Sequence, residues 1–278
     1  MPSQHNPPTQ KNHNAKRSTM KPKNPITVIS ASSPQTDDTR GNALYERLKS
    51  ELSPLLVLLL HFLWASDADK LCYELKPYRP RNPNSIWTTW YDFWYHTGTP
   101  IYTMHPTTYE PSLSRSSRLA VLTRENCVDS CFVLLHALQR LFSTGTHIHS
   151  IAWVSSMIRP RLVLLNDNRS QKFHDYFVLT SVCGAKFVFD PTGFQFGFPD
   201  FFYTWEEYEE RYRDWNFAEE EGECQDDSGQ WLVEEYERCG GAEWVRDLES
   251  FRNSLEGLEI SEFRTYAERA EEWKDLLC

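Results

Sequence analysis

Two β-rich runs with a short break between them constrain the fold of this chain more than any other feature. Residues 173–182 and 186–190 carry alternating apolar side chains, and the three residues between them include Gly184. Glycine readily adopts the positive φ that tight turns require, so the two runs predict an antiparallel β-hairpin. Two further runs rich in apolar and β-branched residues, 148–154 and 161–165, predict additional strands.

The register of the predicted hairpin decides whether His174 and Asp190 meet. Side chains alternate between the two faces of a strand, and in an antiparallel pair the numbers of opposed residues sum to a constant. A two-residue turn gives an odd sum, which puts the two side chains on opposite faces. A loop of three or five residues gives an even sum, which puts them on the same face. We predict an odd-numbered loop, or a bulge with the same effect.

A cysteine stands at the polar start of an apolar helix. Residues 126–143 have helical spacing of apolar side chains, with Asn126 as the expected N-cap and Cys127 in the first turn. Steps of four and three from Cys127 return to one side of the helix, so we expect Cys127 to begin the face that packs inward. The other members of this face are Cys131, Leu134, Leu138 and Leu141.

Composition divides the 278 residues into three parts. Residues 1–42 are rich in Pro, Ser, Thr and Asn with few large apolar side chains, which predicts a disordered basic tail. Residues 43–215 are the predicted globular domain, opening with a leucine-rich helix over 43–64 that Pro54 should kink or restart. Residues 216–278 follow as a predicted acidic, helical C-terminal extension.

The last third of the chain predicts helices on either side of a polar loop. Thr204 and Glu207 form a capping box for a helix over 205–212. Residues 217–230 are polar and acidic, so we expect a mobile loop there. The remaining helices are predicted at 231–238 and 243–277, the second broken near Gly257.

Residues 73–118 lack helical or strand periodicity because six prolines interrupt them. Within this segment, residues 86–95 are dense in aromatic side chains. Such a stretch is typical of packed core, and it is also typical of the wall of a substrate cleft. A second aromatic stretch, residues 191–199, contains glycine and proline and predicts an irregular loop.

Charge and cysteine usage bear on partners and location. Residues 200–278 hold 25 acidic and 8 basic side chains, whereas nucleic-acid binding needs concentrated basic surface, so we expect none. The longest apolar run, residues 52–65, is too short to span a bilayer, and no secretory signal is recognisable at the N-terminus. Seven scattered cysteines favour reduced thiols and an intracellular, cytoplasmic protein.

Cys127, His174 and Asp190 together predict nucleophilic thiol chemistry. The thiolate is the attacking form of cysteine, and both a helix N-terminus and a neighbouring imidazolium favour it. His174 is the expected base and acid, and Asp190 is expected to orient its ring. The N–H groups of the helix start can also receive the oxyanion that forms when the sulfur adds to a carbonyl.

Three motifs carry a resemblance to a known family: a leucine-rich helix opening with Asn126-Cys127-Val128-Asp129, an aromatic strand beginning at His174, and a strand ending in Asp190-Pro191-Thr192. This set, over about residues 120–197, resembles the transglutaminase-like branch of the papain-like cysteine superfamily. The resemblance implies an α+β core with the nucleophile helix packed on an antiparallel sheet, helical N- and C-terminal additions, and a thioester intermediate. It also implies an upstream oxyanion donor, for which Trp87, Trp90 and Trp94 are candidates.

Two function classes stay open at this point. The first is a cysteine hydrolase or acyltransferase, whether peptidase, deamidase or transglutaminase-like, acting on a protein or peptide-like amide or an ester. The second is a catalytically inactive papain-like module that binds a protein partner. We expect no cofactor and no metal, because Cys127 and Cys131 share a helix side from which His136 points away.

Overall fold

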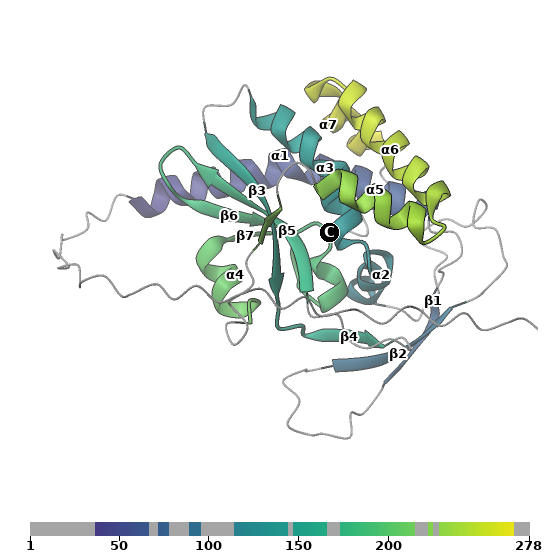
Figure 1. The fold of residues 1–278 in the computed structure, drawn as a ribbon. Coiled ribbons are helices and arrows are strands. Elements are labelled where there is room, and N and C mark those ends of the chain that lie inside the picture. The colour runs from purple at the N-terminus through teal and green to yellow at the C-terminus, as the bar shows by residue number, and fades with distance from the viewer. Residues whose placement is uncertain are drawn as a thin grey trace, which may run out of the picture. The chain divides into compact units, whose positions relative to one another are not determined.

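The five-stranded sheet at the centre of the chain is antiparallel throughout. Its strand order is β7-β6-β5-β3-β8; Figure 1 labels β3, β5, β6 and β7. The strands are β3 (Ile148–Met157), β5 (Phe173–Ser181), β6 (Lys186–Phe189), β7 (Phe202–Thr204) and β8 (Gly222–Cys224). β8 corrects the prediction of a mobile loop over 217–230, since three of those residues pair with β3.

Our structure is a computed structural model in which one compact unit extends from Asp38 to Cys278. Most of the predicted tail, residues 1–42, lies outside the described residues, although helix α1 already begins at Asp37. The described residues are 37–66, 72–77, 89–95, 114–143, 147–165, 173–214, 222–224 and 228–269.

A second sheet of three strands arises where the sequence predicted irregular structure. β1 (Cys72–Pro77) pairs antiparallel with β2 (Thr89–Tyr95), and β2 pairs parallel with β4 (Leu162–Leu165). Only β4 was expected, because the prolines of 73–118 masked the two short strands between them. Pro77 ends β1 and so leaves the strand interior free of proline.

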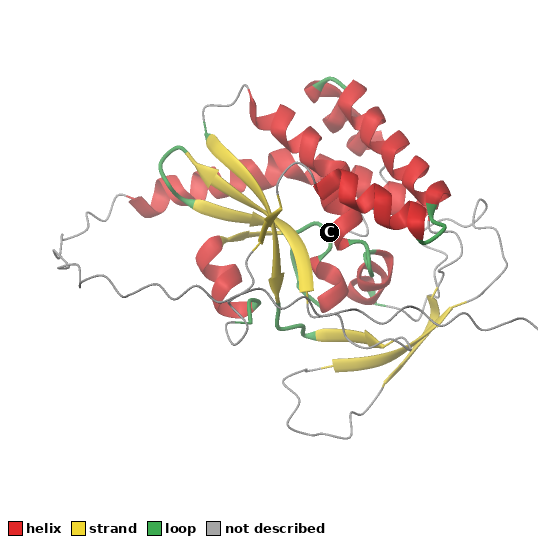
Figure 2. Ribbon diagram, in the orientation of Figure 1, coloured by secondary structure: helices red, strands yellow, loops and turns green. Residues whose placement is uncertain are grey.

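Helices cover the five-stranded sheet and confirm an α+β fold (Figure 2). The expected helix at 43–64 is part of α1 (Asp37–Ser66), which continues through Pro54 without a second start. The other helices are α2 (Arg115–Leu122), which was not predicted, α3 (Cys127–Ser143), α4 (Trp205–Arg211), α5 (Ser228–Arg238), α6 (Ala242–Gly257) and α7 (Ile260–Arg269), with a 3₁₀ turn, η3 (Gly193–Phe196). The predicted break near Gly257 is confirmed between α6 and α7.

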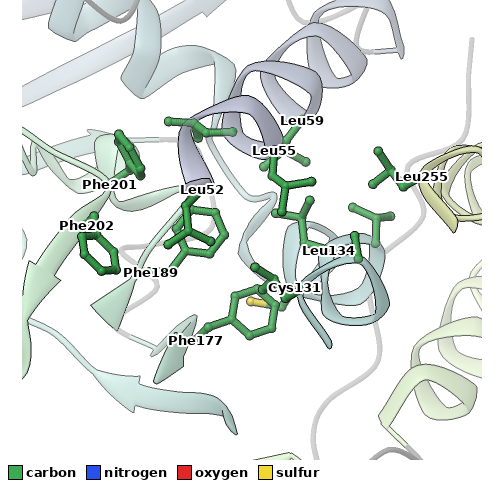
Figure 3. Packing of buried hydrophobic residues seen from close by; sticks show 14 of the residues in the cluster. Leu52, Leu55, Leu59, Cys131, Leu134, Phe177, Phe189, Phe201, Phe202 and Leu255 are labelled. Carbon is green, nitrogen blue, oxygen red and sulfur yellow. The ribbon is translucent and has the colours of Figure 1, made fainter. Parts of the chain in front are cut away.

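Strand alternation divides the apolar side chains of the sheet into two clusters. Phe177 and Phe189 face the cluster that contains the leucines of α1 and the inner side of α3 (Figure 3). Tyr176 and Val188 face the second cluster, which contains the tyrosines of α4. From Tyr176 to Leu179, the apolar side chains of the central strand β5 are thus buried on one side or the other, which fixes the register of the strand.

The apolar part of α1 is longer than the sequence analysis assumed. By length and composition Gly41–Ser66 is able to cross a membrane, with a hydropathy of 1.4 over its most apolar window. Within this structure 44% of that window is buried, and Leu52, Leu55 and Leu59 are fully buried in the core (Figure 3). This packing is that of a core helix.

The hairpin loop has the odd length that the register argument requires. Phe177 lies opposite Phe189 and Thr180 opposite Lys186, so the numbers of opposed residues sum to an even value. Ser181 N–H donates to Ala185 O at 2.8 Å, which leaves a three-residue loop. The prediction is confirmed, and His174 and Asp190 belong to the same face of the sheet.

We expect Gly184→Ala to destabilise the protein by about 1 kcal/mol, because the backbone at Gly184 has a φ of 87° that a Cβ disfavours. Gly257→Ala is the matched control. In the described part of the chain, nothing lies within 4 Å of the position that an added methyl group would take at either glycine, and of the two only Gly184 has a positive φ. Urea denaturation of both variants tests this, and equal stabilities would contradict it.

Candidate active site

Cys127 is the first residue of α3, as expected from its sequence position. Asn126 occupies the N-cap position, since its carbonyl accepts the Ser130 N–H at 2.9 Å. The Asn126 side chain does not cap the helix but donates to Arg124 O at 2.8 Å, which stabilises the turn that precedes the helix. The Cys127 side chain is 6% exposed, and Cys131 and Leu134 behind it are fully buried, which confirms the predicted inward face.

His174 and Asp190 form a hydrogen-bonded pair beneath the surface. His174 Nε2 lies 2.8 Å from Asp190 Oδ1, and both side chains are 0% exposed. His174 lies on β5, and Asp190 follows the last residue of β6, so the even register brings them together across the two strands. The Thr192 N–H also donates to Asp190 Oδ1, at 3.3 Å.

Tyr208 completes the surroundings of Asp190, and the sequence analysis did not identify it. Its hydroxyl donates to Asp190 Oδ2 at 2.8 Å, and the side chain is fully buried. Tyr208 lies on α4, whose start at the Thr204 cap was predicted and is confirmed by the Glu207 N–H bond to Thr204 Oγ1 at 3.2 Å. The helix was therefore foreseeable, but the contact depends on how α4 packs against β6.

Gly193 makes room for this carboxylate. A Cβ at Gly193 would lie 2.5 Å from Asp190 Oδ2 and 2.8 Å from a ring carbon of Phe198. Only glycine fits here without moving Asp190. The aromatic loop that the sequence predicted after Asp190 is a 3₁₀ turn, and it begins at this glycine.

The electrostatics of His174 follow from its partners. Burial alone would lower the pKa of His174, but the charge of Asp190 and the hydrogen bond to it, with a further contribution from Cys127, raise this pKa to about 10. The pairing with Asp190 therefore favours the protonated form of the ring. Its Nδ1 is buried and has no hydrogen-bond partner among the residues that the structure describes.

The sulfur of Cys127 makes a hydrogen-bonding contact with a residue that was not predicted. Cys127 Sγ lies 3.7 Å from Asp175 Oδ2. Cys127 is also near enough to the imidazole ring to raise the pKa of His174. His174 is thus hydrogen-bonded directly to Asp190. The thiol of Cys127 lies close to both His174 and Asp175, which are adjacent residues of β5.

The C-terminal helices hold the start of α3. Asp129, one of the first-turn residues, accepts hydrogen bonds from Tyr236 Oη at 2.9 Å and from Trp244 Nε1 at 2.9 Å. Further along α3, His136 Nδ1 lies 2.7 Å from Glu256 Oε1. The predicted extension therefore packs on α3, and Asp129 is a buried carboxyl whose partners lie more than 100 positions away in the chain.

The arrangement places a thiol, an imidazole and two carboxyl groups close together. Within the described residues, no group of three His, Cys, Asp or Glu side chains is placed to hold a metal ion. The candidate oxyanion donors Trp87, Trp90 and Trp94 have side chains outside the described part of the chain. The donors that remain are the N–H groups at the start of α3, which point outward along the helix axis beside Cys127.

We expect Tyr208→Phe to lower the free energy of unfolding by about 1.5–3 kcal/mol, because it leaves one oxygen of a buried carboxylate without its donor. Tyr45→Phe is the control: it removes a hydroxyl that donates to the neutral carbonyl of Phe202 at 2.8 Å and should cost about 0.5–1.5 kcal/mol. Chemical denaturation measures both. A smaller loss for Tyr208→Phe than for Tyr45→Phe would contradict this account.

The raised pKa of His174 predicts how stability changes with pH. The folded-state pKa of about 10 exceeds the usual 6.5, so the His174–Asp190 pair contributes full stability below about pH 6.5 and loses it as pH rises through about 10. The stability difference between wild type and His174→Gln should therefore shrink from pH 6 to pH 10 in reducing buffer. His136→Gln is the control, because it changes a histidine away from this pair. A stability difference between wild type and His174→Gln that stays constant from pH 6 to pH 10 would refute the prediction.

Comparisons with protein-family models, with curated proteins and with solved structures find no match to this chain.

Proposed function

We propose that this protein is a thiol-dependent acyl-transfer enzyme with a papain-like, transglutaminase-like core, in which Cys127 is the nucleophile, His174 the base and acid, and Asp190 the residue that orients the ring. One observation carries the proposal. The buried His174–Asp190 pair at 2.8 Å leaves His174 Nδ1 without a hydrogen-bond partner in the described structure, next to a cysteine at a helix start.

The chemistry begins with the charge of the site. A protonated His174 stabilises a thiolate on Cys127, and Asp190 stabilises the protonated ring. The thiolate adds to the carbonyl carbon of an amide or ester. The oxyanion that forms points toward the N–H groups of the first turn of α3, where the helix dipole favours negative charge.

The intermediate then collapses to a thioester. The carbon–sulfur bond remains, the bond to the leaving nitrogen or oxygen breaks, and His174 gives its proton to the leaving group. Water or an amine, deprotonated by His174, attacks the thioester and frees Cys127. Hydrolysis and transfer to an amine share every step except the identity of this second nucleophile.

The order and packing of the elements support the family assignment. A cysteine helix is followed by a histidine strand and by a second strand that ends in aspartate, and α3 packs against β3 and β5. Asp190 begins a tight turn with Pro191 and Thr192. The family that the chain resembles has a similar turn after its aspartate. We extend the proposal to a protein or peptide-like amide as substrate and to an intracellular location.

An inactive protein-binding module is the second candidate, and the low exposure of the site favours it. Cys127 is 6% exposed and His174 is fully buried, so little of either side chain is accessible to a substrate. In the inactive protein the His174–Asp190 pair is only a structural ion pair, and the cysteine is a small core residue.

Selective alkylation distinguishes the two candidates. At pH 6 we expect iodoacetamide to modify Cys127 at least about tenfold faster than the exposed Cys183 and Cys239, because only a stabilised thiolate reacts quickly there. His174→Ala should abolish this preference, and Asp190→Asn should reduce it.

Mass spectrometry of the modified peptides measures the rates in one sample, so the two exposed cysteines are internal controls. Slow labelling of Cys127 in the folded wild type, at or below the rates of Cys183 and Cys239, would refute the proposal and favour the binding module.

A further inference from the structure

Asp175 is a buried carboxyl beside the nucleophile that the proposed triad does not use. It follows His174 on β5, and adjacent residues of a strand face opposite sides of the sheet. His174 therefore shares its side with Tyr176, whereas Asp175 shares its side with Phe177, which packs in the same cluster as the inner face of α3. The Asp175 side chain is 8% exposed.

Asp175 is held in one orientation. Trp153 Nε1 donates to Oδ1 at 3.0 Å from the neighbouring strand β3. Because the indole N–H is only a donor, Oδ1 must be an acceptor, and the second oxygen, Oδ2, is directed at Cys127 Sγ at 3.7 Å. Burial raises the pKa of Asp175, while Trp153, the charge of His174, Cys127 and Ser155 each lower it in part.

The contact between Oδ2 and the sulfur changes during the proposed reaction. While Cys127 is a neutral thiol, it donates its hydrogen toward Oδ2. A thiolate or an acylated sulfur has no hydrogen to donate. Asp175 Oδ2 therefore loses the hydrogen bond that it accepts from Cys127. A buried carboxylate that loses a hydrogen bond is unfavourable, and an N–H group of a bound substrate would restore it.

We infer that Asp175 is a specificity-determining residue that accepts a hydrogen bond from the N–H of the scissile carboxamide, so that the enzyme prefers amides bearing an N–H over esters. This inference rests on the proposed function. The nitrogen is bonded to the carbon that the sulfur attacks, and it therefore comes within hydrogen-bond reach of an oxygen that lies 3.7 Å from the sulfur.

The proton balance leaves Asp175 unchanged. The thiolate electron pair forms the carbon–sulfur bond, the carbon–nitrogen bond breaks, and the imidazolium of His174 supplies the proton with which the nitrogen leaves as ammonia or an amine. Asp175 accepts a hydrogen bond from this nitrogen throughout and takes no proton.

Two alkylating probes test this inference without knowledge of the natural substrate. Iodoacetamide carries N–H groups, and 2-iodo-N,N-dimethylacetamide has none. In both reactions the sulfur forms a bond to the methylene carbon and iodide leaves. We expect Cys127 of the wild type to prefer iodoacetamide by about tenfold more than the exposed Cys239 does in the same sample.

Asp175→Asn should remove this extra preference, because an amide whose oxygen accepts from Trp153 presents N–H groups to the probe instead of an acceptor. Trp153→Phe removes the hydrogen bond to Asp175 Oδ1 and should weaken the extra preference for iodoacetamide. This variant replaces Asp175→Asn in the test if Asp175→Asn does not fold. Asp200→Asn removes a carboxylate that pairs with Lys49 on another part of the chain and should leave the preference unchanged.

The outcomes separate this inference from the proposed function. Rapid labelling of wild-type Cys127 with no extra preference for iodoacetamide overturns the role of Asp175 and leaves the nucleophile intact. The same holds if folded Asp175→Asn keeps the wild-type preference. Labelling of wild-type Cys127 no faster than that of Cys239 with either probe overturns both.

Discussion

The hydrogen bond between His174 and Asp190 is the contact around which the rest of the site is arranged. An ionised pair with no exposed surface is costly to bury unless its remaining hydrogen-bonding positions are also used. Asp190 satisfies this condition through Tyr208 and the Thr192 N–H, and the absence of a side chain at Gly193 leaves space for it. The hairpin, α4 and the turn after β6 are thus tied to one carboxylate.

A second carboxylate connects α3 to the C-terminal helices α5 and α6. Asp129 is buried near the start of α3, where a negative charge is favoured by the helix dipole, and it is bound by Tyr236 and Trp244. Arg140, farther along α3, donates to the carbonyls of Leu255 and Leu258 at the end of α6. The acidic C-terminal region thus has a structural role besides its solvated glutamates. Its aromatic side chains and backbone carbonyls bind residues of α3 and position that helix.

Much of the core could be predicted because it depends on local periodicity. The hairpin followed from the position of Gly184 and the alternating side chains, and its odd loop was predicted because His174 and Asp190 share a face only in an even register. The inward direction of Cys127 followed from helical spacing. The strands β1 and β2 could not be found in this way, since each is short and lies in a segment with several prolines. β8 was missed because it is a three-residue edge strand whose pairing partner, β3, supplies most of its stability.

The order of cysteine, histidine and aspartate, the helix and strands that carry them, and the even register that His174 and Asp190 need in order to meet can all be read from the sequence. These follow from the periods of strands and helices, which are local properties. The three-residue loop that provides this register is a finding of the structure. Tertiary structure alone decided that Tyr208 binds Asp190, and that the thiol of Cys127 points at Asp175. Such contacts join residues from separate elements, and their existence depends on packing distances that no local pattern encodes.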